Sequence, residues 1–347
     1  HMSHTLLFKV VTENQFEEKG RLQHKMSFRT LHGRSVTPMT VFTQAQGELQ
    51  SSLAVLYTII FIPGLIGNLV ALWVFLFVHS KKNSMRVFLI NIALADLLLM
   101  VCLPFRVLYH SQGNRWTLGP TLCRVVGNLF YMNMYISITL LGMISVDRYL
   151  KIHRSARMER RLTTRGSTAV CALTWAGAVV LMIPLAMSKS QSQTECFHYK
   201  QLLEAKWKAY INIGIVAVFW LVFITLMASY AKIGRYLRKR SVEYPNFPSA
   251  SQYKCSAKKS FFILFLFTMC FVPYHLVRIF YIKTQITETP RFWRSVADRA
   301  NEISLVFSAF NSCLDPVMYF LLSSSVRREV DNTKSYIPGF TGHTGDI

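Results

Sequence analysis

Long apolar stretches are the feature of this sequence that most limits what the chain can fold into. Seven of them are long enough to cross a bilayer, which takes about 20 mostly apolar residues in a helix. A helix in the core of a soluble protein rarely stays apolar over such a length. The sequence therefore predicts an all-α membrane protein, a bundle of seven transmembrane helices. The predicted spans are Leu53–Val78, Val87–Phe105, Val125–Val146, Gly166–Ser188, Ala209–Ala231, Ser260–Val277 and Ile303–Val326.

The composition supports this class and limits the partners. Charged residues make up only 16% of the 347 residues, compared with about 25% in a typical soluble domain. The net charge of +22 would by itself raise nucleic acid as a partner. Because the sequence shows no soluble basic face with elements that read a groove, we expect no nucleic-acid binding. We assign the excess charge to loops beside the membrane instead.

Basic residues between the spans indicate the orientation of the chain. Connections on one side, counted together with the C-terminal tail, contain 21 Lys and Arg, whereas those on the other side contain nine. Cytoplasmic loops carry the excess of basic residues, so we expect an extracellular N-terminus and a cytoplasmic C-terminus. The basic connections are 79–86, 148–165 and 232–259, with the tail after residue 322.

Two of the seven cysteines, Cys123 and Cys196, lie outside the spans on the predicted outer side. Cys123 stands at the outer start of the third span, and Cys196 stands in the second outer connection. Disulfides form on the oxidising side of a membrane. We therefore predict a bridge between them that holds the connection over the mouth of the bundle. The alternative is two free surface thiols.

Two acidic residues, Asp96 and Asp315, lie inside predicted spans. An ionisable group within the bilayer is unfavourable and marks a functional site by default. Together with Ser137 and Asn311, the two carboxylates supply the oxygen ligands that a small hard cation prefers. We therefore expect a sodium or proton site, and a structural sodium ion is the only cofactor that we expect. In the alternative, each aspartate is protonated and hydrogen-bonded to polar neighbours.

Basic residues also gather at the outer half of the predicted bundle. Arg106 ends the second span, Arg278 follows the apolar part of the sixth, and Lys200 lies near the bridged connection. Cations that converge on one mouth suit a phosphate or a carboxylate, although each alone could extend to lipid head groups. Asn301 and Glu302 open the seventh helix nearby. A single acid among cations suggests a ligand that also carries an ammonium group.

Six of the seven spans carry a short motif. The motifs read Gly67-Asn68, Leu94-Ala95-Asp96, Asp147-Arg148-Tyr149, Trp175, Cys270-Phe271-Val272-Pro273 and Asp315-Pro316-Val317-Met318-Tyr319. In this order and on these spans they resemble the rhodopsin-like (class A) G-protein-coupled receptors, over about residues 53–330. The resemblance implies a receptor in the plasma membrane and not an enzyme, and we find no nucleophile–base pair or metal set.

The resemblance also implies an organisation and roles for polar residues. The expected parts are an extracellular segment 1–52, the bundle 53–322, a short amphipathic helix 323–330 and a flexible cytoplasmic tail 331–347. The expected sodium and activation network comprises Asn68, Asp96, Ser137, Asn311, Asp315 and Tyr319. The expected contact with the G protein comprises Asp147, Arg148 and Tyr149.

Departures from the family pattern indicate which branch of the family this sequence resembles. Phe271 stands where the family usually has Trp, so a Trp rotamer switch cannot operate unchanged, and Asp315 replaces the usual Asn. Both are familiar in the purinergic-type branch. A retinal pigment needs a lysine in the seventh span, and 303–326 has none. An amine receptor needs a carboxylate in the outer third span, and 125–146 is uncharged.

Four segments, 130–137, 196–199, 271–278 and 310–316, are similar to the lysophosphatidylserine receptors of the purinergic-like cluster. The resemblance implies a lysophospholipid agonist, an inhibitory G protein and membrane lipids as partners. The acyl chain would lie in an apolar groove beside Leu181, Ile211 and Val218. The alternatives are a nucleotide receptor on the same fold and, more remotely, a transporter or channel, which usually shows repeated halves. The residues expected to bind the ligand are Arg106, Tyr131, Tyr199, Lys200, Asn212, Arg278, Tyr281, Asn301 and Glu302.

Overall fold

The structure is a computed structural model that describes residues 38–78, 84–153, 163–187, 196–197, 202–243 and 250–322. Every regular element in these ranges is a helix, as predicted. The chain divides into two units, His1–Leu49 and Gln50–Ile347, and the second unit contains the helix bundle. The helices are α2 (Pro38–Trp73), which continues into a π-helical turn η1 (Val74–Val78), α3 (Ser84–Ser111), α4 (Pro120–His153), α5 (Thr164–Met187), α6 (Lys206–Glu243), α7 (Ala250–Ile286) and α8 (Arg291–Leu322).

Seven helices of the described residues are long and apolar enough to cross a membrane, which confirms the predicted class. They extend beyond the apolar stretches. Helix α6, for example, has 38 residues and is about 57 Å long at 1.5 Å per residue, whereas the hydrocarbon of a bilayer is about 30 Å thick. The extra turns contain the polar and basic residues of the helix ends. The predicted amphipathic helix 323–330 and tail 331–347 lie outside the described residues.

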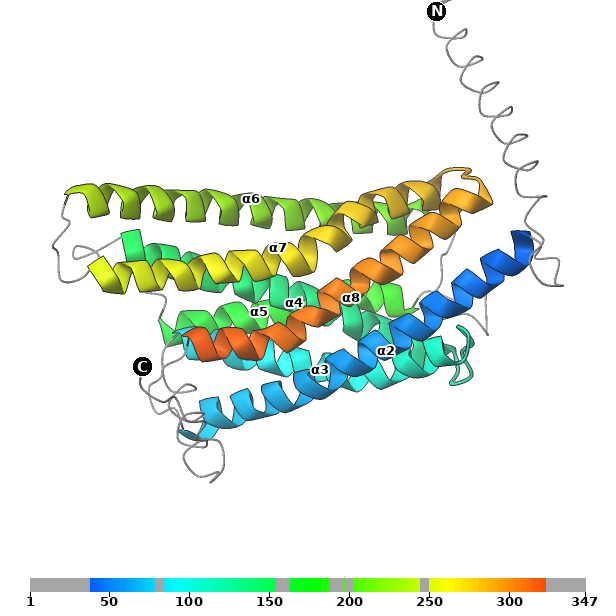
Figure 1. The fold of residues 1–347 in the computed structure, drawn as a ribbon, viewed down its shortest axis with the longest axis horizontal. Coiled ribbons are helices and arrows are strands. Elements are labelled where there is room, and N and C mark those ends of the chain that lie inside the picture. Colours follow the sequence, from blue (N-terminus) through cyan, green and yellow to red (C-terminus); the bar gives the residue numbers. More distant parts are fainter. Residues whose placement is uncertain are drawn as a thin grey trace, which may run out of the picture. The chain divides into compact units, whose positions relative to one another are not determined.

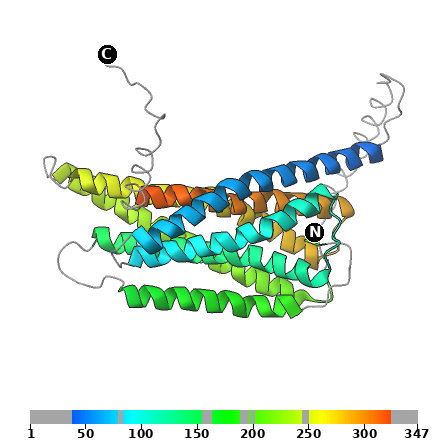
Figure 2. The ribbon, with the colours of Figure 1, turned by 90° about the horizontal axis from the view of Figure 1, so that it is seen from below.

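Helix α4 has neighbours on several sides, because it packs against α3, α5, α6 and α7. Helix α8 packs against α7 and α3, and the helices run side by side (Figures 1 and 2). Trp175 Nε1 donates a hydrogen bond of 3.0 Å to Asn91 Oδ1, which connects α5 with α3. The α3–α4 and α7–α8 connections lie at the same end of the bundle, on the right in Figure 1. The last turns of α3 and α7 and the first turns of α8 therefore lie at that end of the bundle.

Glycines allow α2 to approach its neighbours closely. A Cβ atom at Gly67 would lie 2.6 Å from Pro316 Cγ, and one at Gly64 would lie 2.8 Å from Met100 Sδ. Protein interiors leave no space for such overlap. Helix α2 is therefore packed tightly against α8 and α3. This close packing brings Asn68, the next residue after Gly67, into the buried polar centre.

The outward surface of the bundle is apolar. Phe77, Leu173 and Leu221 are 77%, 73% and 66% exposed. A soluble protein rarely exposes a large continuous apolar surface, whereas a bilayer accommodates one. Asp96 and Asp315, by contrast, are fully buried. Polar groups inside the bundle must therefore bind one another or a ligand, since no bulk water reaches them.

Candidate functional site

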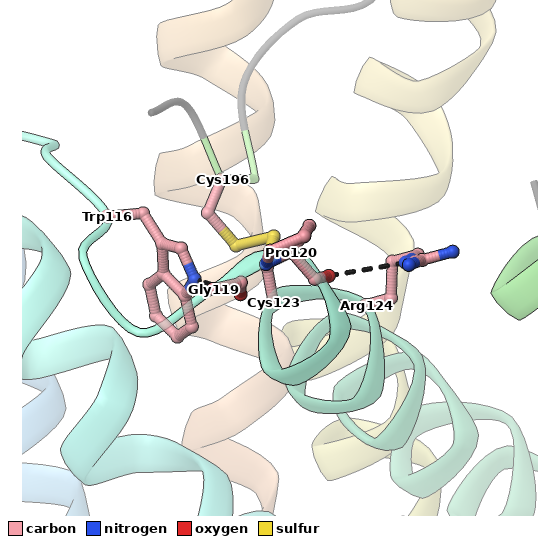
Figure 3. The surroundings of a disulfide bond; sticks show 6 residues. All are labelled: Trp116, Gly119, Pro120, Cys123, Arg124 and Cys196. Carbon is pink, nitrogen blue, oxygen red and sulfur yellow. Dashed lines mark hydrogen bonds between the residues drawn. A yellow bond between two sulfur atoms is a disulfide. The ribbon is translucent and has the colours of Figure 1, made fainter. Parts of the chain in front are cut away.

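A disulfide connects the first turns of α4, at its predicted outer end, to the second predicted outer connection. Cys123 and Cys196 are bonded, with their Cα atoms 5.8 Å apart, which confirms the predicted bridge (Figure 3). Trp116 Nε1 donates a hydrogen bond of 2.6 Å to Gly119 O in the segment before α4. Gly119 has a φ of +84°, which glycine adopts without strain, and Pro120 then begins the helix. These contacts hold Cys196 and its neighbour close to the outer turns of α3 and α4.

Arg106 lies inside the outer half of the bundle, and its side chain is only 1% exposed. Its Nη1 atom lies 3.2 Å from Glu302 Oε2, so a salt bridge joins α3 to α8. The guanidinium also lies between two aromatic rings, with its Cζ atom 4.2 Å from the ring centroid of Phe130 and 4.4 Å from that of Phe197. A buried cation requires partners of this kind, because its desolvation is otherwise strongly unfavourable.

His110 joins this ion pair, although none of the motifs pointed to it. Its Nε2 atom lies 3.7 Å from Glu302 Oε2, and its Nδ1 atom lies 2.9 Å from Asn114 Oδ1. The imidazole ring is stacked on Tyr57, with the ring centroids 5.8 Å apart. One signal was present in the sequence. His110 follows Arg106 by four residues, and residues at this spacing share one face of a helix.

A second arginine, Arg278 on α7, is half-buried and has different partners. Its Nη1 atom donates a hydrogen bond of 3.2 Å to Asn301 Oδ1, and its Nη2 atom donates one of 3.1 Å to Asn212 Oδ1. No carboxylate among the described residues pairs with it, and its Nε atom has no hydrogen-bond partner there. Amide dipoles and ring faces stabilise this cation without neutralising it. The rings around its Cζ atom are those of Tyr131, Tyr274 and Tyr281, at 5.8, 5.8 and 4.8 Å.

Two predicted helix limits are wrong. Asn301 and Glu302 do not open the seventh helix, because α8 begins at Arg291 and places them almost three turns further along. Arg106 does not end the second helix either, since α3 continues to Ser111. In both helices polar turns extend beyond the apolar stretch, and an apolar pattern does not detect them. Arg106 and Glu302 consequently lie inside the bundle rather than at its rim.

Seven of the nine residues expected to bind a ligand lie among the described residues, and they form two groups. Their function as ligand residues stays a prediction. Tyr199 and Lys200 lie outside the described residues. The first group is Arg106 with Glu302, and the second is Arg278 with Tyr131, Asn212, Tyr281 and Asn301.

A buried polar network connects α2, α3, α4 and α8 in the middle of the bundle. Asp96 Oδ1 accepts a hydrogen bond of 2.7 Å from Ser312 Oγ and one of 3.1 Å from Asn133 Nδ2. The Tyr319 hydroxyl lies 3.4 Å from Asp96 Oδ2 and 3.3 Å from Asn68 Oδ1. The network thus brings together residues that were predicted to share it. It also includes Asn133, which the motifs did not indicate.

Asp315 and its neighbours have oxygen atoms that lack a donor. Asn311 Nδ2 donates a hydrogen bond of 2.6 Å to Asp315 Oδ2, and Asp315 interacts directly with Asp96. The other oxygens, Asp315 Oδ1, Asn311 Oδ1 and Ser137 Oγ, are buried without a hydrogen-bond partner among the described residues. Buried oxygens of this kind are unfavourable unless a proton or a cation satisfies them. The oxygen atoms of the four predicted residues are of the kind that a small hard cation prefers, and cation binding by them stays a prediction.

The opposite end of the bundle contains the motif predicted to contact a G protein. Asp147 is buried and Tyr149 is half-buried near the end of α4, while the side chain of Arg148 lies outside the described residues. Close by in the chain, Ser145 Oγ accepts a hydrogen bond of 2.6 Å from the Tyr230 hydroxyl. This contact connects α4 with α6 beside the motif.

Aromatic contacts connect α6 with α7 at the position where the family usually has Trp. Phe271 is fully buried there, and its ring centroid lies 5.3 Å from that of Phe267. Its carbonyl oxygen lies 2.8 Å from His275 Nδ1. The His275 ring in turn is stacked on Phe219, with the centroids 3.5 Å apart. The departure at Phe271 is therefore part of a larger aromatic cluster.

Seven spanning helices with a buried polar centre define a class of membrane receptor. Residues 67–319 match the 7 transmembrane receptor (rhodopsin family). The chain therefore belongs to the rhodopsin family of seven-transmembrane receptors, as the motifs predicted. Members of this family are multi-pass membrane receptors that act on G proteins, and they are not enzymes.

Individual relatives agree with this assignment. The chain is 43% identical over 350 residues to "Probable G-protein coupled receptor 34" of Pan troglodytes, across 93% of this chain and 92% of the relative. It is 49% identical over 284 residues to the protein of the same name from Mus musculus, across 81% and 76%. A purinoceptor of Bos taurus is 34% identical over 298 residues, across 84% and 87%. These similarities confirm the predicted purinergic-like branch.

Proposed function

We propose that this receptor binds a lysophospholipid and that lysophosphatidylserine is its agonist. The observation that carries the proposal is the presence of two arginines with different partners in the predicted outer half of the bundle, Arg106 buried and Arg278 half-buried. Arg106 is paired with Glu302, whereas amides and tyrosine rings hold Arg278. The head group of lysophosphatidylserine carries a phosphate, a carboxylate and an ammonium group. This set of charges complements the two sites.

The phosphate fits Arg278. The planar guanidinium donates two parallel hydrogen bonds to a phosphate, and such charge-assisted bonds are stronger than bonds to a neutral amide. A phosphate can therefore replace Asn212 or Asn301 as an acceptor. Tyr131 and Tyr281 lie close enough to Arg278 to add hydroxyl donors for the remaining phosphate oxygens.

The serine part of the head group fits the ion pair of Arg106 and Glu302. Its carboxylate would bind Arg106 and its ammonium group would bind Glu302. The two charges of the ligand then replace the salt bridge between Arg106 and Glu302, and each of the four charged groups has a partner of opposite charge. An anion that has no amine would take Arg106 away from Glu302 and leave that carboxylate without its main counter-charge. The pair therefore favours a zwitterionic ligand.

The acyl chain requires an apolar path out of the bundle. Helices α5 and α6 each pack against α4, and Gly177 on α5 and Gly214 on α6 have open space where a Cβ atom would lie. Leu181 is 48% exposed and Val218 is 59% exposed on the same two helices. Together with Ile211, these residues support a groove between α5 and α6 that is open to lipid.

The polar centre is proposed as a sodium site. Asp96, Asp315, Ser137 and Asn311 would hold the ion, because three of them have buried oxygen atoms without a donor. The positive charge would neutralise two carboxyl groups that interact directly. The direct contact of two buried acids is unfavourable when both are ionised without a cation.

The receptor is further proposed to signal through inhibitory G proteins from the plasma membrane, with its N-terminus outside. The 21 basic residues of one side of the chain, against nine on the other, support this orientation. It places Asp147, Arg148 and Tyr149 at the cytoplasmic end of α4. The choice of G protein is supported by the resemblance of Phe271, Asp315 and the basic inner connections to receptors that engage this class.

A nucleotide is the second candidate ligand, and the names of relatives favour it. Besides the purinoceptor of Bos taurus, the "Uracil nucleotide/cysteinyl leukotriene receptor" of Homo sapiens is 31% identical over 349 residues, across 94% of this chain and 93% of the relative. A nucleotide carries several phosphate charges and no acyl chain. It would need more cations than Arg106 and Arg278 and would make no use of an apolar groove.

One cell assay separates the two candidates. Cells with and without the receptor are treated with lysophosphatidylserine or ADP, and inhibition of cyclic AMP formation is measured with and without pertussis toxin. We expect a response to lysophosphatidylserine that depends on the receptor and that the toxin abolishes. A response to ADP alone would favour the nucleotide. A response that the toxin leaves intact would contradict the choice of G protein but not the receptor assignment.

A further inference from the structure

We infer that Phe197 is a positioning residue for Arg106, so that the outer disulfide acts on the binding site through one aromatic ring. The inference rests on the proposed function, because it assumes that Arg106 binds the carboxylate of the ligand. It adds a residue that itself needs no contact with the ligand. The contact between its ring and Arg106 is open to measurement without any ligand.

The backbone determines where the Phe197 side chain points. Phe197 directly follows Cys196, which is bonded to Cys123, and its φ is +61°. Bulky residues rarely adopt this left-handed conformation, and they keep it only where the surroundings hold them. The covalent bond at the preceding residue is one such restraint. The conformation directs the ring toward Arg106, whose Cζ atom lies 4.4 Å from its centroid.

Contacts around the ring hold it in this place. Tyr109 and Trp116 meet it edge to face, with centroids 5.3 and 5.7 Å away, and such pairs add stability beyond their buried area. On α4, a Cβ atom at Gly127 would lie 3.4 Å from Phe197 Cε1. This is an ordinary van der Waals distance, so the ring lies directly against the space that a Cβ atom would fill. A larger side chain there would push the ring away from α4.

The position of the ring matters because Arg106 has few other restraints. One hydrogen-bond donor, Nη1, is engaged by Glu302, while Nε has no hydrogen-bond partner among the described residues. The rings of Phe130 and Phe197 lie nearest to the guanidinium and hold its plane, while the third ring, that of Tyr57, is farther away at 5.8 Å from the Cζ atom. A carboxylate binds Arg in the plane of its fork. Removal of one face would therefore loosen the orientation on which the ligand contact depends.

The direct test compares Phe197→Leu with Phe197→Tyr in membranes, with radiolabelled lysophosphatidylserine as the probe and surface expression checked. Leu keeps apolar bulk and removes the π face, so affinity should fall about fivefold to thirtyfold, the equivalent of a buried cation–π contact. Tyr keeps the face and should retain affinity. In an Arg106→Ala background, Phe197→Leu should have no further effect. In an Arg278→Ala background, the full effect of Phe197→Leu should remain. The aromatic rings around Arg278 are those of three tyrosines and do not include Phe197.

A second measurement needs no ligand. The melting temperature of the purified receptor is measured for the same single and double variants. The effects of Phe197→Leu and Arg106→Ala should be non-additive, whereas those of Phe197→Leu and Arg278→Ala should add. If lysophosphatidylserine does not bind the wild-type receptor, the proposed agonist is wrong, and this cycle still tests the inference. Additive effects for Phe197 and Arg106 would overturn it, and so would wild-type affinity in Phe197→Leu.

A milder variant serves if Phe197→Leu does not fold. Gly127→Leu keeps every aromatic residue and the disulfide. A Cβ atom at this position already lies in contact with the Phe197 ring, so the atoms of Leu beyond Cβ would displace the ring. We expect a smaller loss of lysophosphatidylserine affinity that disappears in the Arg106→Ala background. A loss of the same size in both backgrounds would contradict the inference.

Discussion

Arg106 Nη1 and Glu302 Oε2 form a salt bridge of 3.2 Å, although the two residues are 196 positions apart in the chain. The pair joins α3 to α8, and the side chains are only 1% and 13% exposed. Because the site is nearly dry, removal of either partner leaves a charge without compensation. An agonist that carries both charges can exchange with the pair, and this exchange alters a direct link between two spanning helices.

Replacement of Arg278 by Ala should lower agonist potency. The change removes a charge-assisted contact of about 1.5–3 kcal/mol, which corresponds to about a tenfold to hundredfold loss. The measurement is a concentration–response curve for lysophosphatidylserine at matched surface expression. Arg291→Ala is the control, since Arg291 is an exposed arginine at the start of α8, and potency should not change. Wild-type potency in Arg278→Ala would exclude Arg278 as a ligand residue.

Replacement of Glu302 by Gln should distinguish ligands by their amine. Lysophosphatidylserine loses the partner of its ammonium group, whereas lysophosphatidic acid has no amine to lose. Arg106 is also freed from its counter-charge, which favours an anion. Potencies of both lipids are compared in the same cells, and the loss should be confined to lysophosphatidylserine. An equal loss for both lipids would mean that Glu302 only supports the structure.

A larger side chain at Gly214, beside the proposed groove, should act on the acyl chain. Gly214→Leu places a side chain in open space, so long-chain lysophosphatidylserine should lose potency while the chain-free head group, glycerophosphoserine, binds as before. Competition binding with both compounds measures the difference. Gly47→Leu on α2 is the matched control, because Gly47 has equal open space. Unchanged long-chain potency in Gly214→Leu would place the chain elsewhere.

Sodium should oppose the agonist through the polar centre. If the ion holds the inactive bundle, agonist and sodium weaken each other by the same factor. A rise in sodium at constant ionic strength, balanced with a large organic cation, should lower agonist affinity in membranes. Asp96→Asn should remove this dependence. A salt effect that persists in Asp96→Asn would instead indicate screening of Arg106 and Arg278, and the two carboxyl groups would then share a proton.

The contact of Gly67 with α8 should be intolerant of a methyl group. A Cβ atom there would lie 2.6 Å from Pro316 Cγ, and overpacking of this kind costs about 1–3 kcal/mol. We expect Gly67→Ala to lower the melting temperature of the purified receptor. Gly47→Ala in the same helix meets open space and should leave it unchanged or slightly higher. A wild-type melting temperature in Gly67→Ala would show that α2 shifts freely.

Much of the fold was predictable because its signals are local. A bilayer requires about 20 consecutive apolar residues for each span, and this length can be counted along the chain. The Cys123–Cys196 bridge was predictable for a related reason, since the spans leave these two cysteines on the outer side. Residues of the polar centre, such as Asp96 and Asp315, were recognisable because charged side chains are rare inside spans.

The partners of the buried charges were decided by the tertiary structure alone. An apolar count gives neither the rotation of a helix about its axis nor the polar turns that extend it. Arg106 and Glu302 were therefore expected at the ends of their helices. Their pairing depends on how α3 and α8 pack over 196 intervening residues. The proximity of His110 to Glu302 and of Phe197 to Arg106 has the same origin. The sequence by itself determined which residues must enter the membrane, and packing determined which of them meet, because contact depends on three-dimensional distance and not on spacing along the chain.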